Sequence, residues 1–254
     1  MLPVALTVAG SDPSGGAGLQ ADLKTFHQFG VYGEAVVTLI TVQNTFSLER
    51  VETLAPDLVL AQLCAVLSDI PPRAAKTGAL GNAAVIEAVA EAAKTFEFPL
   101  VVDPVMISKH GARLVEAASF GRLIERAYLL TPNLYEASAL VGFTVDNRDS
   151  MHRAAEKLIG MGARNVLVKG GHLPGDALDL LYLEGGDVQD FSAARIDTPH
   201  THGTGCTYSA AITAELAKGT GLLQAVSLAK TFVTEAIRSN PGLGHGAGPL
   251  NHFA

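Results

Sequence analysis

The sequence has few of the residues that several common classes of protein depend on. Its 254 residues include no tryptophan and only two cysteines, Cys64 and Cys206, too few for a disulfide scaffold. We therefore expect a reducing, cytoplasmic compartment. Lysine and arginine form no run and the formal net charge is −7, which argues against nucleic acid or an anionic membrane as a partner. The apolar runs are too short to span a bilayer, and the amino terminus has no basic segment typical of a signal peptide.

What the sequence does contain is an alternation of strand-like and helical patterns from end to end. Apolar runs predict strands at residues 4–9, 35–42, 100–103, 127–130 and 165–169, and a hairpin at 178–183 and 188–193. Helical periodicity predicts helices at 19–29, 58–67, 83–93, 134–141 and 150–161, and two more after residue 206. Buried strands joined by helices favour a parallel sheet covered on both faces. With no linker or repeat, we expect one α/β domain over residues 1–254, a three-layer α/β/α sandwich with a mostly parallel central sheet.

The most informative segment is the turn at residues 202–207. A buried helix follows it, so Gly203 and Gly205 are predicted to lie where that helix begins. A helix start leaves N–H groups unpaired and carries partial positive charge, which attracts phosphate. Glycine lets this backbone approach a ligand closely. Cys206 lies in the same field, which favours a thiolate, so the segment is predicted both to hold a phosphate and to supply a base.

Other polar residues are predicted to gather at the same edge of the sheet. Asp12, Gln43, Asp103, Asn133 and Lys169 each fall at or after a predicted strand end. Ligands of α/β sheets bind beyond the carboxyl ends of the strands. The sequence therefore predicts a ligand site built from these residues and the turn at 203–206.

Taken singly, most of these signals have an ordinary structural alternative. Residues 15–18 lack the lysine of a phosphate-binding P-loop and fit a plain glycine turn equally well. Asp103 suits Mg²⁺ or a simple cap. Asn133 and Glu136 fit a helix cap with an acid in the first turn, and the functional alternative places Glu136 on a metal-bound water.

The remaining candidates divide in the same way. Lys169 ends an apolar strand before two glycines, so its ammonium is expected either to meet an anion or to reach water. Cys64 is interpreted as a small core residue. The histidines, including His202, lack metal-ligand spacing and are given loop or cap roles.

Several of these motifs together resemble a known family. Segments 9–25, 42–45, 103–106, 131–136, 169–172 and 201–207 make the chain similar to the ribokinase-like kinases. Within them it resembles the hydroxymethylpyrimidine/phosphomethylpyrimidine kinases of thiamine biosynthesis, over nearly its whole length. Sugar kinases of the superfamily usually carry aspartate where this chain has Cys206, so the cysteine indicates the pyrimidine and pyridoxal branch.

The resemblance implies ATP and Mg²⁺ as cofactors, a homodimer, and a role for each matching residue. It implies that Gln43 hydrogen-bonds the aminopyrimidine ring, with Gly10, Ala17, Asp22 and Val105 around it. The other implied sites are the anion hole of Gly203, Thr204, Gly205 and Cys206, the Mg²⁺ ligands Asp103 and Glu136, and the nucleotide contacts Lys169, Thr204 and Asn133. Ala79 stands where relatives often have methionine against the ring, which affects the expected substrate preference.

The expected reaction is phosphoryl transfer from ATP to a pyrimidine hydroxymethyl group, and then to the resulting monophosphate. The alcohol loses a proton as it attacks, so a base at Cys206 should assist the first transfer. The monophosphate is already an anion, so its attack should depend on charge neutralisation. A kinase must also exclude water, and segments 45–53 and 106–114 are predicted to be mobile lids.

Two other functions fit the same residues. One is a pyridoxal kinase of the same branch, which Gln43 argues against because its amide matches the amino and nitrogen edge of a pyrimidine. The other is a non-catalytic pyrimidine sensor, which the joint presence of Asp103, Glu136, Lys169 and Cys206 argues against.

Overall fold

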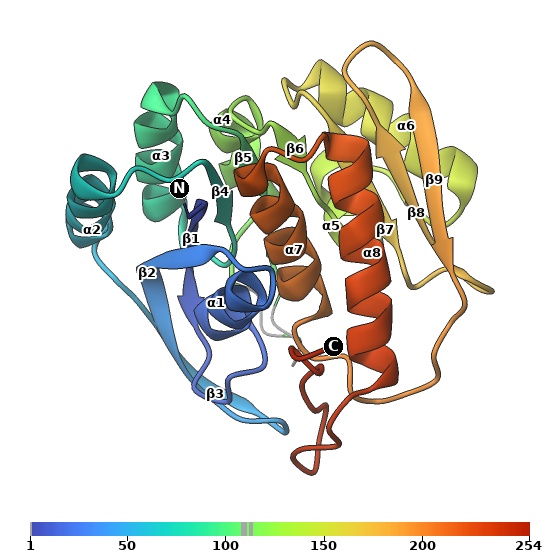
Figure 1. Cartoon of the computed structure of the whole chain (residues 1–254). Coiled ribbons are helices and arrows are strands. Elements are labelled where there is room, and N and C mark those ends of the chain that lie inside the picture. The colour runs from blue at the N-terminus through green and yellow to red at the C-terminus, as the bar shows by residue number, and fades with distance from the viewer. Residues whose placement is uncertain (1, 108–110, 112–113) are drawn as a thin grey trace.

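The computed structural model describes residues 2–107, 111 and 114–254. In this part of the chain the strands form a nine-stranded sheet in the order β3-β2-β1-β4-β5-β6-β7-β8-β9 (Figure 1). Neighbours from β2 through β7 are parallel, whereas β3, β8 and β9 join antiparallel at the two edges. The strands are β1 (Val4–Ser11), β2 (Tyr32–Gln43), β3 (Leu48–Thr53), β4 (Ala74–Thr77), β5 (Leu100–Val102), β6 (Leu129–Leu130), β7 (Val166–Gly170), β8 (Ala177–Tyr182) and β9 (Val188–Ala193).

Helices cover both faces of this sheet, as Figure 1 shows. One face carries α2 (Pro56–Asp69), α3 (Ala83–Ala92), α4 (Gly121–Ile124), α5 (Leu134–Val141) and α6 (Arg148–Gly160), with short 3₁₀ turns at Ala93–Thr95 and Ala117–Phe120. The other face carries α1 (Gly18–Gln28), α7 (Thr204–Lys218) and α8 (Leu222–Arg238). None of the helices in the described ranges is long and apolar enough to cross a membrane.

The central strands are apolar on both sides because each side faces a helical layer. In β5, Val101 packs into the core under α1, α7 and α8, while Leu100 and Val102 pack into the opposite core. Successive side chains of a strand point to opposite faces, so continuous apolar runs satisfy both layers. The predicted three-layer sandwich with a mostly parallel sheet is confirmed.

Most predicted elements are present, and the exceptions have physical causes. Strand β4 was not predicted, because its sequence Ala-Ala-Lys-Thr has low strand propensity, and burial in the middle of the sheet decides its conformation. Residues 45–53, predicted to be a mobile lid, form the tip and returning strand of the β2–β3 hairpin. The second expected lid, 106–114, lies partly outside the described residues.

One interpretation of a cysteine is wrong. Cys64 is exposed, not buried. The buried stripe of α2 consists of Val59 and Leu63. Because each residue advances about 100° around a helix, Cys64 lies beside that stripe, on the solvent side.

Candidate active site

The sheet brings the predicted polar residues to one edge, beyond the carboxyl ends of its parallel strands. The Lys169 ammonium at the end of β7 donates a 2.8 Å hydrogen bond to Oδ1 of Asp103, which follows β5. Thr131 after β6 and Ser209 on α7 also donate to this carboxylate, each at 3.3 Å. The predicted alternative in which the Lys169 ammonium meets an anion is confirmed, and the anion is the Asp103 carboxylate.

The turn before α7 opens directly onto this pair. Gly203 has φ +83°, a conformation that favours glycine, and a Cβ there would lie 1.8 Å from the carbonyl oxygen of Gly16. A Cβ on Gly205 would lie 3.2 Å from the Lys169 ammonium nitrogen. Among the described residues, no acceptor lies against the N–H groups of Gly205 and Cys206. The predicted helix start is confirmed, and it offers two open amides beside a lysine.

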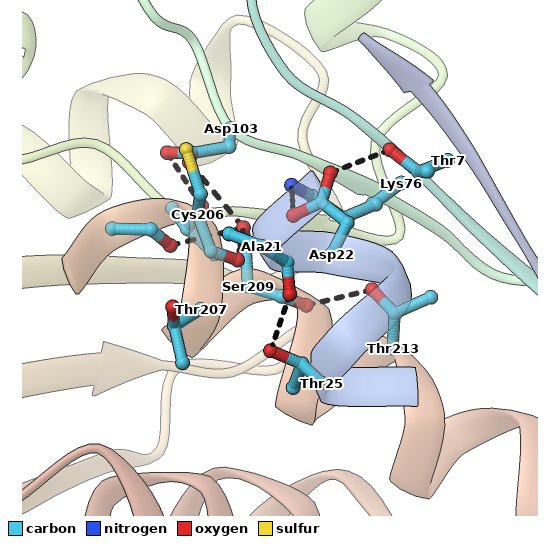
Figure 2. A network of polar contacts seen from close by, with 12 residues as sticks. Thr7, Ala21, Asp22, Thr25, Lys76, Asp103, Cys206, Thr207, Ser209 and Thr213 are labelled. Atoms are coloured by element: carbon cyan, nitrogen blue, oxygen red, sulfur yellow. Dashed lines mark hydrogen bonds and ion pairs between the residues drawn. The ribbon is translucent and has the colours of Figure 1, made fainter. Parts of the chain in front are cut away.

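Cys206 lies half-buried in the first turn of α7, with its sulfur buried near Asp103 (Figure 2). Burial raises the pKa of the Cys206 thiol to about 11, although Lys76 and a hydrogen bond from the Gly18 N–H oppose the rise. The expectation that the helix field favours a thiolate is therefore wrong for this state. The loss of hydration and the nearby carboxylates Asp22 and Asp103 outweigh that field, so the neutral thiol predominates at neutral pH.

Asp22 lies beneath the site and not on its surface. The side chain is fully buried, and its two oxygens accept hydrogen bonds from Lys76 at 2.7 Å and from Thr7 at 2.6 Å (Figure 2). Burial lowers the pKa of the Lys76 ammonium, but the charges of Asp22, Cys206 and Asp103 and the hydrogen bond to Asp22 together outweigh burial and raise it. The expected place of Asp22 beside a bound ring is thus not supported, because both oxygens are used within the protein.

Asn133 and Glu136 form the predicted cap. The Asn133 side chain accepts from the Glu136 N–H and the Glu136 carboxylate accepts from the Asn133 N–H, each at 2.9 Å. Glu136 is nevertheless buried, and burial together with the charge of Asp103 raises its pKa to about 7 despite the opposing charge of Lys169. The cap therefore also places a second carboxylate next to Asp103.

On the other side of the site, Asp12 organises the glycine loop between β1 and α1. Its carboxylate accepts from the N–H groups of Ser14 and Ala17, both at 2.9 Å. It lies 2.8 Å from Nε2 of His202, and the Gln43 side chain is close enough to affect its pKa. Burial alone would raise the pKa of Asp12, but the hydrogen bonds with His202 and Ser14, together with the nearby Gln43 side chain, outweigh burial and lower it.

The remaining expected contacts lie around these groups. Gly10 is buried against Leu39, and Val105 and Ala79 are half-buried after β5 and β4. The Thr204 hydroxyl donates to the carbonyl of Thr201 at 2.8 Å, so it shapes the turn in this state.

Two residues that shape the site, Lys76 and Ser209, were not assigned roles from the sequence. Lys76 lies on β4, which was not predicted as a strand. Asp12 was placed in the ligand site and His202 was given a loop or cap role, but their pairing was not predicted. It spans 190 positions, which no local pattern reveals.

The acidic side chains of the site suit a metal ion that needs only one or two ligands from the protein. No group of three or more His, Cys, Asp and Glu side chains that could hold a metal occurs in the described ranges. Asp103 and Glu136 are, however, two adjacent buried carboxylates whose repulsion a cation would relieve. Mg²⁺ commonly uses one or two carboxylates with water and phosphate oxygens, so these residues fit it.

Comparison with known proteins gives a consistent result. The model of a family described as phosphomethylpyrimidine kinase matches residues 12–251. A hydroxymethylpyrimidine/phosphomethylpyrimidine kinase of Bacillus subtilis is 46% identical over 98% of this chain and 94% of its own length. A thiamine biosynthesis bifunctional protein of Geobacter sulfurreducens is 48% identical over 98% of this chain and 52% of its own.

Solved structures agree with these relatives. A phosphomethylpyrimidine kinase of Clostridium difficile superimposes with a TM-score of 0.81 at 42% identity, covering 92% of this chain and 99% of that one. A Bacillus subtilis pyridoxal kinase in complex with ADP superimposes with a TM-score of 0.90 at 40% identity, covering 99% and 98%. The expected ribokinase-like fold is confirmed.

Proposed function

The chain belongs to the phosphomethylpyrimidine kinase family, and from this we propose that it phosphorylates 4-amino-5-hydroxymethyl-2-methylpyrimidine and then its monophosphate, using ATP, in thiamine biosynthesis. The observation that carries the proposal is the position of the open N–H groups of Gly205 and Cys206 beside the ion pair of Lys169 and Asp103. This arrangement offers positive groups where the charge of a transferring phosphoryl group develops.

In the first transfer, the hydroxymethyl oxygen attacks the terminal phosphorus of ATP. A new bond forms between these atoms, and the bond from that phosphorus to the bridging oxygen of ADP breaks. The N–H groups of Gly205 and Cys206 and the Lys169 ammonium hold the equatorial oxygens, and Thr204 and Asn133 border the nucleotide phosphates. Phosphoryl transfer depends mainly on such positioning and charge stabilisation.

Asp103 and Glu136 would hold Mg²⁺ and its waters beside these phosphates. The ion would neutralise charge on the phosphate oxygens when bound. The Asn133 N–H holds the Glu136 carboxylate in place, and Lys169 balances Asp103 before nucleotide enters.

Cys206 is proposed to accept the proton of the hydroxymethyl group in the first transfer. With a pKa of about 11, its thiolate is a small fraction at neutral pH but a strong base. The second transfer has a phosphate monoester as acceptor and no proton to lose, so it depends on Lys169 and the amides. The two transfers thus make different demands on the same turn.

The acceptor ring is proposed to lie against Gln43, with Gly10, Ala17 and Val105 around it. Gln43 lies at the end of β2, near Asp12. Its amide has both a donor and an acceptor, which match the amino group and ring nitrogen of the pyrimidine.

Pyridoxal phosphorylation is the second candidate activity, because the structural neighbours include a pyridoxal kinase. Competition kinetics with both alcohols separates the two. The family relationship argues against a non-catalytic sensor.

A coupled assay of ADP release with hydroxymethylpyrimidine as acceptor tests the proposal, with phosphorus NMR to identify the monophosphate and diphosphate. We expect both products in sequence. Turnover with pyridoxal but with neither pyrimidine would refute the pyrimidine assignment.

We also propose a cytoplasmic homodimer. The reaction consumes ATP, and the exposed Cys64 thiol suits a reducing compartment. Three large apolar side chains of β2 are about half exposed and offer a contact surface; they are Tyr32, Ile40 and Val42. Light scattering of the purified protein checks the dimer.

A further inference from the structure

The loop after α8 contacts the tip of the β2–β3 hairpin. The Ala247 N–H donates to the carbonyl of Thr45 at 3.0 Å, and the Gly246 N–H donates to the Thr45 hydroxyl at 3.2 Å. The rings of His245 and Phe46 stack beside these bonds, with centroids 6.0 Å apart. Figure 1 shows the loop and the hairpin tip next to one another at the lower edge of the molecule.

The same loop also contacts the turn that leads to the open amides. The carbonyl of Gly248 accepts from the His202 N–H at 3.1 Å, and the Gly248 N–H donates to Nδ1 of His200 at 3.1 Å. Residues 244–248, which we call the C-terminal strap, therefore connect the hairpin tip with the turn before α7.

A second connection closes these contacts into a ring. The His202 side chain pairs with Asp12 at 2.8 Å, and the Gln43 side chain lies near enough to Asp12 to lower the pKa of that carboxyl. Gln43 is only two residues from Thr45, where the strap begins its contacts. The ring thus joins the residue proposed to hold the acceptor with the turn proposed to hold the phosphate.

Close packing makes glycine necessary in the strap. A Cβ on Gly246 would lie 2.1 Å from the carbonyl oxygen of Thr45, and one on Gly248 would lie 2.4 Å from that of Leu243. Gly244 has φ +80°, and its Cβ would lie 2.5 Å from a methyl carbon of Thr45. These close contacts leave no room for a side chain at the three glycines. The close contacts at Gly244 and Gly246 therefore hold the backbone of the strap tightly against Thr45 of the hairpin.

We propose that the C-terminal strap is a positioning element, which fixes the β2–β3 hairpin against the turn before α7 and so sets the distance between acceptor and phosphoryl group. The part of this proposal that concerns catalysis rests on the proposed kinase function. Loosening the strap should weaken acceptor binding and let water compete for the phosphoryl group, while nucleotide binding on the Lys169 side stays unchanged.

The first experiment is independent of activity. Hydrogen exchange of residues 44–53 and 200–206 is measured in the ligand-free enzyme and in Gly246→Ala. We expect faster exchange in both segments of the variant. Gly160→Ala is the matched control, because a Cβ at this exposed end of α6 meets nothing within 4 Å. Unchanged exchange in Gly246→Ala would overturn the proposal.

The second experiment uses a milder change, in case Gly246→Ala does not fold. Thr45→Val removes the acceptor for the Gly246 N–H at nearly constant volume, and Thr45→Ser keeps it. In Thr45→Val we expect the KM for hydroxymethylpyrimidine to rise about fivefold, the change that corresponds to the loss of one hydrogen bond, and the KM for ATP to stay unchanged. The ratio of ATP hydrolysed to product formed should rise as well. In Thr45→Ser, both this ratio and the KM for hydroxymethylpyrimidine should stay close to those of the wild type.

The outcomes separate the two proposals. Equal changes in both KM values, or no rescue by Thr45→Ser, would contradict positioning of the acceptor by the strap. A wild-type enzyme that phosphorylates no pyrimidine would refute the proposed function, while the exchange measurement would still decide whether the strap holds the hairpin.

Discussion

The ammonium of Lys169 on β7 lies 2.8 Å from Asp103, which follows β5, although the two residues are 66 positions apart and β6 lies between the two strands. The sheet order creates this pair, and Gly205 leaves space directly above it. The lysine therefore balances the carboxylate until the phosphates of a nucleotide arrive. The pair joins the proposed phosphate site to the proposed metal site.

Replacing Lys169 by methionine should reduce both transfers. We expect kcat/KM to fall by about 10²–10³-fold, the effect of removing one group that stabilises transition-state charge. Steady-state kinetics with each acceptor measures it. Lys94→Met is the control, because Lys94 forms only an exposed pair with Glu91. A loss below tenfold would show that Lys169 does not contact the transferring group.

The buried pair of Lys76 and Asp22 should contribute strongly to stability. Lys76→Met leaves the Asp22 carboxylate without a counter-charge in the core, and we expect a loss of about 3–5 kcal/mol in the free energy of unfolding. Urea denaturation measures the loss. Arg164→Met is the comparison, since Arg164 and Glu184 are mostly exposed and that pair contributes less than about 1 kcal/mol. Equal losses in both variants would contradict the account.

Glu34 should make stability depend on pH. Burial, with a smaller effect from Asp69, raises its pKa to about 7, and Oε2 has no partner in the described part of the chain. A carboxyl with a raised folded-state pKa binds its proton more tightly when folded, so stability falls as pH rises from about 4.5 to 7.

Glu34→Gln removes this titration. The variant should resemble the wild type near pH 5 and exceed it in stability near pH 8, by on the order of 1 kcal/mol. Urea denaturation at both pH values checks the sign. A variant that is less stable at pH 8 than the wild type would contradict the assignment.

Cys206→Ala should separate the two transfers. If the thiolate is the base, the first transfer falls by about 10²–10⁴-fold and the second far less. Because burial raises the pKa of the thiol to about 11, the first-transfer rate in the wild type should also rise with pH through the neutral range. Equal losses in both transfers, or a loss below tenfold in the first, would assign Cys206 a role in shaping the site only.

The sequence was sufficient to predict features that depend on local patterns. Apolar runs located β1, β5 and β7, and the glycines of residues 203–205 located the start of α7. The convergence of Asp103, Asn133 and Lys169 followed from the rule that parallel strands end at one edge. Such features need only short-range periodicity and the usual handedness of α/β folds.

Features that depend on long-range packing were not predicted. The exposure of Cys64, the neutral state of the Cys206 thiol and the burial of Asp22 all depend on neighbours far away in the chain. The C-terminal strap is of the same kind, since Gly244 and Gly246 are explained by the approach of Thr45, and Gly248 by the approach of His200 and Leu243.

The central claim is that the turn before α7 binds the transferring phosphoryl group. A crystal structure with hydroxymethylpyrimidine and an ATP analogue whose terminal phosphate cannot transfer tests it most directly. We expect terminal phosphate oxygens at roughly 2.7–3.2 Å from the N–H nitrogens of Gly205 and Cys206, with the sulfur of Cys206 facing the acceptor hydroxyl. A terminal phosphate held elsewhere, or a sulfur closed off from the acceptor, would contradict the account.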